Sequence, residues 1–225
     1  MAWRLLEGVP DEETRRLLSI ARRRVFARNE VVFHQGDPAD ALHLIRAGRF
    51  AVRIRTALGD AVTVAIVGPG ESFGELALVG DEDDRSAGIV ALERAETLSI
   101  TRSDLARFRK EQPQVNELLV RMLAAQLRRT NELLAEALYV PADRRVLQRL
   151  RELAELYRSD DGRAAIPLTQ EEISELAGTS RATVNRVLRA EERAGTVELT
   201  RGRTVIVDAS RLGEGFRAGR QQAAR

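Results

Sequence analysis

The sequence contains no cysteine, which excludes several kinds of covalent and metal chemistry. Disulfides, thiol nucleophiles, iron–sulfur clusters on cysteine ligands and cysteine-based zinc sites all need a residue that the chain does not have. Only His34 and His43 could supply imidazole ligands, so a histidine-rich metal site is poorly supplied. No nucleophile–base pair and no carboxylate pair in a cleft-like context is evident. We therefore expect that the protein is not an enzyme and needs no cofactor.

Long apolar runs are also missing. No segment approaches the roughly 18 uninterrupted apolar residues of a membrane helix, and the first residues turn acidic before a signal-peptide core could form. We expect a cytoplasmic protein without a membrane partner. The 225 residues, 44% hydrophobic and 31% charged, are enough for one large or two small globular domains.

Lysine is almost absent, whereas arginine is abundant. Of the 36 basic residues Lys110 is the single lysine, and 34 acidic residues leave a net charge of +2. This composition is typical of a GC-rich genome. The alternative explanation is that some of the arginines bind phosphate, because guanidinium groups match phosphate oxygens better than ammonium groups do. Between Arg181 and Arg211, seven arginines face four acidic residues. We expect any nucleic-acid contact in that segment.

The first half of the chain has the pattern of a β domain. From about Val25 to Ile100, short apolar or alternating runs end at recurring glycines, which is typical of an antiparallel sandwich or barrel. The segments Asp11–Arg23 and Ser103–Glu111 have the acidic or hydroxyl starts of short helices. These helices are expected to flank the β domain.

After Pro113 the apolar period changes from 2 to 3.6, and the pattern continues to Val140–Pro141. The helix predicted there would have about 25 residues and a length of about 37 Å. One apolar stripe, around Leu119 and Met122, suits packing on the β domain. A second stripe has heptad spacing, which suits pairing with another copy of the helix, although one broad core-facing surface is the alternative. This seam consists of Val120, Leu123, Leu127, Thr130, Leu134 and Ala137.

The most specific pattern follows a predicted helix at Asp143–Tyr157. Thr169 and Glu172 have the spacing of a capping box at the start of a short helix. Gly178 allows a left-handed turn, and Ser180 can cap a second helix that runs from Arg181 to about Ala194. Two helices joined by such a turn form a helix-turn-helix, whose second helix enters the major groove of DNA.

The outer face of the second helix carries arginines and an asparagine but no acid. Arginine pairs with guanine and asparagine with adenine in the commonest base contacts, whereas the alternative is an ordinary solvated face. A predicted hairpin, Val197–Leu199 with Thr204–Val207, would place arginines on phosphates. The tail Arg211–Arg225 has no clear pattern. The residues expected at DNA are Thr169, Ser180, Arg181, Thr183, Asn185, Arg186, Arg189, Arg201 and Arg203.

A glycine-rich loop, Gly68–Glu75, lies in the β half. Its glycine spacing is wrong for a dinucleotide fingerprint, and no suitable helix follows it. Glycines let backbone amides approach an anion, and Arg85, Ser86 and Ala87 offer a guanidinium, a hydroxyl and further amides. A carboxylate such as Glu75 would repel phosphate but accept a proton from a ribose hydroxyl. The combination suits a nucleotide.

Two motifs give the chain a family resemblance. The segment GESFGELALVGDEDDRSA resembles the phosphate-binding cassette of cyclic-nucleotide-binding domains. Together with LTQEEISELAGTSRATVNRVL, it resembles the cyclic AMP receptor protein (CRP/FNR) family of bacterial transcription regulators, from about Val25 to Val207. The resemblance implies an α+β fold: an N-terminal β-jelly-roll that binds cyclic nucleotide (1–112), a dimerisation helix (113–140) and a C-terminal winged helix-turn-helix (141–225).

The resemblance also implies roles for individual residues. Glu75 would bind the ribose 2′-hydroxyl, and Arg85 and Ser86 would bind the cyclic phosphate. Thr130, the polar residue in the heptad seam, would contact the adenine amino group, and Asn131 would reach across from the partner subunit. The complete expected nucleotide site is Gly74, Glu75, Leu76, Arg85, Ser86, Ala87, Thr130 and Asn131.

The function implied is a cyclic-AMP-responsive transcription regulator. It would act as a homodimer on a near-palindromic operator, with double-stranded DNA and RNA polymerase as partners. Cyclic AMP would be an effector, with cyclic GMP as an alternative, and its binding would move the DNA domains about Val140–Pro141. Two alternative functions fit the same sequence. One is a regulator of this fold with another effector or none, and the other is a cyclic-nucleotide module that regulates a protein partner.

Two departures from the family pattern bear on function. The acidic run Asp81–Asp84 directly before Arg85 weakens the attraction for phosphate, and it could pair with the arginine in the empty state. Ala182 stands where well-studied members carry a glutamate that contacts cytosine. The operator of such a member therefore cannot be assigned to this chain.

Overall fold

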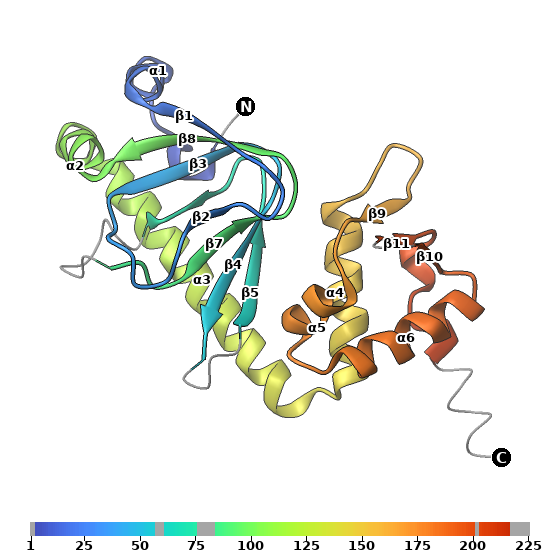
Figure 1. The fold of residues 1–225 in the computed structure, drawn as a ribbon. Coiled ribbons are helices and arrows are strands. Elements are labelled where there is room, and N and C mark those ends of the chain that lie inside the picture. The colour runs from blue at the N-terminus through green and yellow to red at the C-terminus, as the bar shows by residue number, and fades with distance from the viewer. Residues whose placement is uncertain (1–2, 57–60, 76–83, 201–202, 217–225) are drawn as a thin grey trace. The chain divides into compact units, whose positions relative to one another are not determined.

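A computed structural model describes residues 3–56, 61–75, 84–200 and 203–216 (Figure 1). The chain forms two compact units, Met1–Asn131 and Glu132–Arg225, so the boundary falls within the long helix. No helix in the described stretches combines the length and apolar character that spanning a bilayer requires.

The first unit contains two four-stranded sheets, with the strand orders β1-β8-β3-β6 and β2-β7-β4-β5. Neighbouring strands are antiparallel throughout both sheets, which confirms the predicted β domain. The strands are β1 (Arg22–Phe26), β2 (Val31–Phe33), β3 (Ala41–Ala47), β4 (Phe50–Arg55), β5 (Ala61–Val67), β6 (Ser72–Phe73), β7 (Gly88–Ala91) and β8 (Ala95–Thr101).

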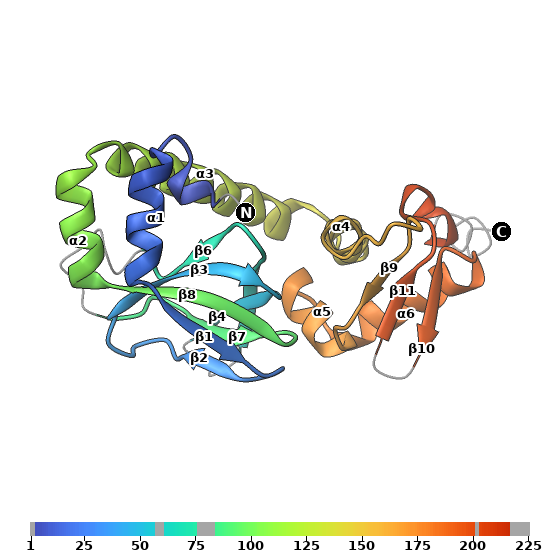
Figure 2. The ribbon, with the colours of Figure 1, turned by 90° about the horizontal axis from the view of Figure 1, so that it is seen from above.

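Strand β3 lies at the centre of this unit and is buried on both of its faces. Successive side chains of a strand point to opposite faces. Leu42 and Leu44 join an apolar cluster with the flanking helices, whereas Ile45 packs with Phe50 and Phe73 in a second cluster. The helices thus cover one face of the first sheet (Figure 2). They are η1 (Arg4–Leu6), α1 (Asp11–Ile20), α2 (Arg102–Glu111) and the start of α3 (Gln114–Tyr139).

The flanking helices differ slightly from those predicted. Helix α1 ends at Ile20, because the chain from Arg22 onward pairs with β8. Arg22 pairs with Ser99, and the local sequence does not reveal so distant a partner. Helix α2 begins one residue earlier than predicted, because the Thr101 side chain caps it by accepting from the Asp104 amide. The long helix is confirmed as α3, on which Leu119 is buried and Met122 packs against the same cluster.

The second unit contains the end of α3, three further helices and a three-stranded sheet of order β10-β11-β9. Its core joins side chains such as Val146, Ile173 and Val184, each from a different helix. Strand β9 was not predicted, because three residues carry little local signal and are fixed by pairing with β11. The elements are α4 (Ala142–Leu156), β9 (Ala164–Ile166), α5 (Gln170–Ala177), α6 (Arg181–Arg193), β10 (Val197–Thr200), β11 (Arg203–Ile206) and η3 (Ala209–Arg211).

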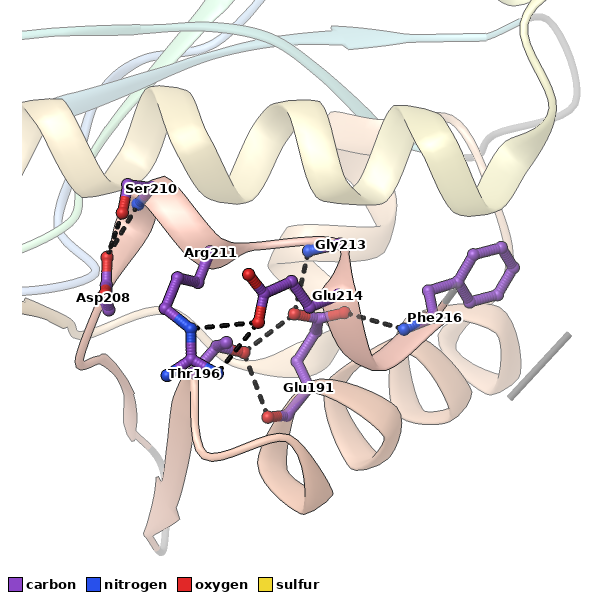
Figure 3. Close-up of polar contacts among 8 residues, drawn as sticks. All are labelled: Glu191, Thr196, Asp208, Ser210, Arg211, Gly213, Glu214 and Phe216. Carbon is purple, nitrogen blue, oxygen red and sulfur yellow. Dashed lines mark hydrogen bonds and ion pairs between the residues drawn. The ribbon is translucent and has the colours of Figure 1, made fainter. Parts of the chain in front are cut away.

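A buried carboxylate attaches the segment after η3 to helix α6 (Figure 3). Glu191 is fully buried, and its Oε2 accepts from the Thr196 hydroxyl at 2.8 Å and the Gly213 amide at 2.9 Å. Its Oε1 accepts from the Phe216 amide at 3.2 Å. The part of the tail up to Phe216 is therefore packed on the domain, although the sequence shows no pattern there. Residues 217–225 lie outside the described residues.

Replacing Glu191 by glutamine should destabilise this unit by about 1–3 kcal/mol, because the NH2 group that replaces one carboxylate oxygen cannot accept from a buried N–H or O–H group, although the remaining carbonyl oxygen can. Urea unfolding of the full chain measures the change. Glu214→Gln is the control, since Glu214 is an exposed residue paired with Arg211, and its loss should change the free energy of unfolding by less than about 0.5 kcal/mol. Equal effects of the two substitutions would contradict the anchoring role of Glu191.

Candidate functional site

Arg85 is a buried arginine with unused hydrogen-bond donors. Its side chain is 3% exposed, and its guanidinium carbon lies 4.0 Å from the centre of the Phe33 ring. Nη2 donates to Asp40 Oδ1 at 2.9 Å, but Nε and Nη1 are buried without a hydrogen-bond partner. Buried polar atoms without partners are rare in proteins, because each costs about 1–3 kcal/mol. Two unpaired N–H donors on a charged guanidinium are suited to binding an anion.

The partner of Arg85 is not the one considered from the sequence. Asp84 precedes Arg85 directly, yet the side chain pairs with Asp40, which lies 45 residues earlier in the chain. Residues 81–83 of the acidic run lie outside the described residues. Backbone hydrogen bonds hold Arg85 in place, since its N–H donates to Asp37 and its carbonyl accepts from Gly36, both at 2.8 Å. Nothing in the sequence around Asp40 indicated that it would pair with Arg85.

Glu75 and Gly74 lie beside this arginine. A Cβ added to Gly74 would lie 2.6 Å from Arg85 Nη1 and 2.9 Å from the Ala41 carbonyl, and the backbone has φ +87°. Only glycine permits this close approach. The carboxylate oxygen Oε2 of Glu75 is buried without a partner, and burial raises the pKa of Glu75 although the Arg85 charge opposes that shift. The acceptor Oε2 of Glu75 and the donors Nε and Nη1 of Arg85 are thus all unpaired, and Gly74, which precedes Glu75, lies against the Arg85 guanidinium.

His43 has a structural rather than a ligand-binding environment. His43 is stacked on Phe73 with ring centres 4.9 Å apart, and its Nδ1 lies 3.0 Å from the Thr97 hydroxyl. Burial, followed by the charges of Arg85 and Arg24, lowers the pKa of His43 to about 4, so it is neutral near pH 7. Over the described ranges, no group of three or more acidic or histidine residues is arranged to hold a metal ion.

The other predicted nucleotide-site residues are less constrained. Ser86 is exposed and Ala87 is half-buried directly after Arg85. Leu76 lies outside the described residues. Thr130 is exposed on α3 and donates to the Gln126 carbonyl at 2.9 Å, which explains how a polar side chain is accommodated on that face. Asn131 is exposed as well. The structure shows no contact that joins Thr130 or Asn131 to Arg85 or Glu75 among the described residues, so their nucleotide roles stay predictions.

The helix-turn-helix has the local geometry that its sequence predicts. Thr169 and Glu172 form both hydrogen bonds of the capping box on α5. Gly178 adopts the left-handed conformation with φ +57°, and the Ser180 side chain accepts from the Thr183 amide at the start of α6. Thr169, Ser180 and Thr183 therefore have capping interactions, and their predicted contacts with DNA stay untested.

Three residues on the outer face of α6 have partners that the sequence did not reveal. Asn185 donates to Gln170 Oε1 at 3.1 Å, and Arg186 forms an ion pair with Asp143 of α4. Arg189 pairs with Glu192 at 2.7 Å on the same helix. Arg181 and Ala182 are exposed at the first turn. The outer face is basic and accessible, but Asn185 is half-buried and its amide is already engaged.

Arg145 of α4 connects the end of α3 to the turn of the helix-turn-helix. Its guanidinium donates to the carbonyls of Ala137 and Val140 at 3.2 and 3.1 Å. It also donates to the carbonyls of Ala177 and Gly178 at 3.0 and 2.7 Å. These bonds cross the Val140–Pro141 step. The movement predicted about that step stays a prediction, and it would require Arg145 to release carbonyls on one side.

The predicted hairpin is confirmed as β10 and β11, which pair from Val197 with Ile206 to Thr200 with Arg203. Arg203 is exposed near the tip of this wing, as a contact with phosphate would require. Arg201 lies outside the described residues.

Two family comparisons match separate parts of the chain. The family described as "Cyclic nucleotide-binding domain" matches residues 23–112, and the "Crp-like helix-turn-helix domain" matches residues 144–214. A cyclic-nucleotide-binding domain followed by this helix-turn-helix domain defines a class of DNA-binding transcription regulators.

Whole-chain relatives identify the family. The "CRP-like cAMP-activated global transcriptional regulator" of Mycobacterium tuberculosis is 34% identical over 190 residues, which are 83% of this chain and 84% of the relative. The "Cyclic AMP receptor protein" of Thermus thermophilus is 36% identical over 211 residues, 93% of this chain and 95% of the relative. The chain belongs to the CRP/FNR family of transcription regulators. Proteins of this family are not enzymes, as the sequence predicted.

A solved structure shows the same fold. The structure of the c-di-GMP responsive global regulator CLP from Xanthomonas campestris has a TM-score of 0.76 and 20% sequence identity. The superposition covers 88% of this chain and 99% of the Xanthomonas campestris chain. At this identity the likeness establishes the fold alone.

The raised pKa of Glu75 gives the stability of the protein a pH dependence. Below the ordinary carboxyl pKa the Glu75 side chain is mostly protonated in both the folded and the unfolded state, so its burial has little ionic cost. At higher pH the unfolded chain ionises more easily than the folded one, so Glu75 lowers the free energy of unfolding. Glu75→Gln should therefore stabilise the effector-free protein at pH 8 but not at pH 4.

Thermal unfolding at both pH values measures this effect. Glu117→Gln is the control, because it removes a carboxylate that is 67% exposed on α3 and should give no comparable gain. An equal gain from Glu75→Gln at pH 4 and pH 8 would show that the charge of the carboxylate is not the cause.

Proposed function

We propose that the protein is a homodimeric transcription regulator that binds a near-palindromic operator in response to cyclic AMP. The observation that carries the proposal is the pair of unpartnered buried donors on Arg85 beside the unpartnered carboxylate oxygen of Glu75. A cyclic nucleotide supplies both missing partners, since its phosphate accepts from a guanidinium and its 2′-hydroxyl donates to a carboxylate.

In this proposal Nε and Nη1 of Arg85 bind the cyclic phosphate while Nη2 stays on Asp40. Ser86, being exposed next to Arg85, adds a hydroxyl. Gly74 lets the backbone approach the site, and Ala87 is proposed to contribute main-chain groups. Leu76 lies outside the described residues, and its expected contribution stays a prediction. Glu75 accepts from the ribose hydroxyl and remains ionised in the complex, because the nearby guanidinium and this hydrogen bond both favour the carboxylate.

Cyclic AMP is the effector that the relatives support. The names of the Mycobacterium tuberculosis and Thermus thermophilus relatives both refer to cyclic AMP. Thr130 is proposed to contact the adenine amino group, and Asn131 to reach the ligand of the partner subunit. A threonine hydroxyl can either donate or accept, so cyclic GMP is the alternative effector.

The proposed dimer rests on exposed apolar side chains of α3. Val120, Leu127 and Leu134 are 64%, 62% and 59% exposed and lie seven residues apart, which is heptad spacing. Leu123 lies between them and is half-buried, and Thr130 and Ala137 complete the seam. An exposed apolar row of this length is unfavourable in water and is covered when two copies of the helix pair.

The proposed DNA contacts follow from the exposed face of α6. Arg181 and Arg186 are proposed to contact bases, with Asn185 if its bond to Gln170 is released. Arg189 and the wing arginines Arg201 and Arg203 would contact phosphates. In a dimer, two recognition helices enter successive major grooves about 34 Å apart, which makes the operator near-palindromic. By linkage, DNA must tighten effector binding as much as the effector tightens DNA binding.

RNA polymerase as a partner and the cytoplasm as location are proposed with this function. The name of the Mycobacterium tuberculosis relative describes a global transcriptional regulator, and transcription regulators act where DNA is transcribed. The proposal includes no cofactor, since the cyclic nucleotide is an effector that binds reversibly.

Arg85→Ala should weaken cyclic AMP binding at least about tenfold, because it removes charge-assisted hydrogen bonds of about 1.5–3 kcal/mol. Calorimetric titration of the full chain with cyclic AMP and cyclic GMP measures the loss. Arg85→Lys keeps the charge but cannot offer the planar pair of donors, so it should also bind weakly. Arg46→Ala is the control, since Arg46 is an exposed arginine of the same domain, paired with Glu96. Unchanged affinity in a folded Arg85 variant would overturn the site.

A third titration with cyclic di-GMP separates effectors, since the Xanthomonas campestris regulator of this fold is described as responsive to it. A gel shift on genomic DNA with and without the tighter ligand then tests whether the effector controls DNA binding. If the wild type binds none of the three nucleotides, the effector part of the proposal is wrong.

Leu127→Glu should raise the dissociation constant of the dimer at least about 100-fold, because an apolar contact of about 1.5–3 kcal/mol is lost from each of two copies. Sedimentation velocity over a range of concentrations measures the change. Ala125→Glu is the control, since it adds the same charge to an exposed position on the opposite side of the helix from the seam. Equal dissociation by both variants, or a monomeric wild type, would contradict pairing through this seam.

A further inference from the structure

Asp143 is a largely buried carboxylate that contacts the outer face of the proposed recognition helix. The residue is 9% exposed in the first turn of α4, whereas the side chain of its partner Arg186 is 60% exposed on α6. Helices α4 and α6 lie in the same compact unit (Figure 2). The ion pair therefore joins a fixed acid in the domain interior to an arginine that is accessible to a ligand.

The start of α4 is held firmly around Asp143. Arg145, two residues later, is bonded to four backbone carbonyls from the end of α3 and from the turn after α5. Val146 and Leu147 follow and are buried in the core. A carboxylate attached to such a segment has little freedom to move. It can therefore fix the guanidinium with which it pairs.

Arg186 is distinguished from the other arginines of the outer face by this partner. Arg189 pairs with Glu192 one turn along the same exposed helix. Arg181 has neither an ion pair nor a side-chain hydrogen bond among the residues that the structure describes. Among these three arginines, and within the described residues, only Arg186 pairs with a carboxylate from another helix.

We propose that Asp143 is a positioning residue for sequence recognition, because it orients Arg186 toward one base pair of the operator. The ion pair uses Nη2, and the remaining N–H groups of the guanidinium stay available for a bidentate contact with guanine. An arginine that is already oriented loses less side-chain freedom on binding. The inference rests on the proposed function, in which Arg186 contacts a base.

The same carboxylate has an opposite effect on general DNA binding. A negative charge near the recognition helix repels phosphates whatever the sequence. Removing the charge should therefore lower the preference for the correct base pair while it leaves binding to unrelated DNA equal or stronger. A carboxylate that merely braced the fold would give a different result, since its loss would weaken binding to every sequence and lower the thermal stability.

The experiment uses selection from random duplexes by the full chain, in the presence of the tighter cyclic nucleotide. Arg186→Ala identifies the base pair at which preference is lost. Asp143→Asn should then reduce the preference at that base pair about threefold or more, and should add no further loss in the Arg186→Ala background. Glu155→Gln is the matched control, because it removes an exposed carboxylate of the same helix that pairs with Arg158 instead.

Each result distinguishes the inference from the function on which it rests. Loss of preference confined to the Arg186 base pair, with equal or tighter binding to unrelated DNA, supports the positioning role. Equal loss at all base pairs together with a lower melting temperature overturns it while Arg186 remains a base contact. If Arg186→Ala changes only the salt dependence of binding, the base contact itself is wrong, and the positioning role is overturned with it.

Discussion

The Arg85 guanidinium is a positive charge inside a β domain, and the architecture of that domain is organised to hold it. Burial of an ion costs several kcal/mol unless partners compensate for the lost hydration. Here one carboxylate, one aromatic face and two backbone hydrogen bonds hold the residue, yet two N–H donors lack partners. This incomplete pairing places a cost on the empty protein that a bound anion would relieve. Burial lowers the pKa of Arg85, whereas Asp40, Asp37 and Glu75 oppose that shift.

Glycine at position 74 and a carboxylate at position 75 are consequences of the same constraint. A side chain at position 74 would collide with the guanidinium, so the backbone approaches it only because a Cβ is missing. Glu75 is held where ionisation is unfavourable in the absence of a ligand. The Glu75 carboxylate and the free donors of Arg85 both lack hydrogen-bond partners, so a single ligand that bonds to both would recover the most free energy. In the proposed function, the β domain would therefore lose some stability and gain affinity for the effector at this site.

In the second unit, charged side chains hold backbone segments rather than a ligand. Arg145 gathers four carbonyls from two helix ends, and Glu191 accepts from two amides of the C-terminal turn. Both side chains satisfy backbone groups that helix and turn ends leave without partners. The recognition helix is thereby fixed at both ends, by the turn at Gly178 and by the anchor at Glu191. Asp143 extends this framework to the outer face of α6.

The sequence alone determined the parts of the protein that depend on local chemistry. The capping box, the left-handed glycine and the serine cap predicted both helices of the helix-turn-helix, because their hydrogen bonds join residues at most a few positions apart. Periodicity predicted the long helix and the β domain, and the resemblance of two motifs to a known family indicated the family. Only the tertiary structure decided the partners of Arg85, Arg186 and Glu191, strand β9 and the end of α1, because each depends on residues brought together from distant parts of the chain.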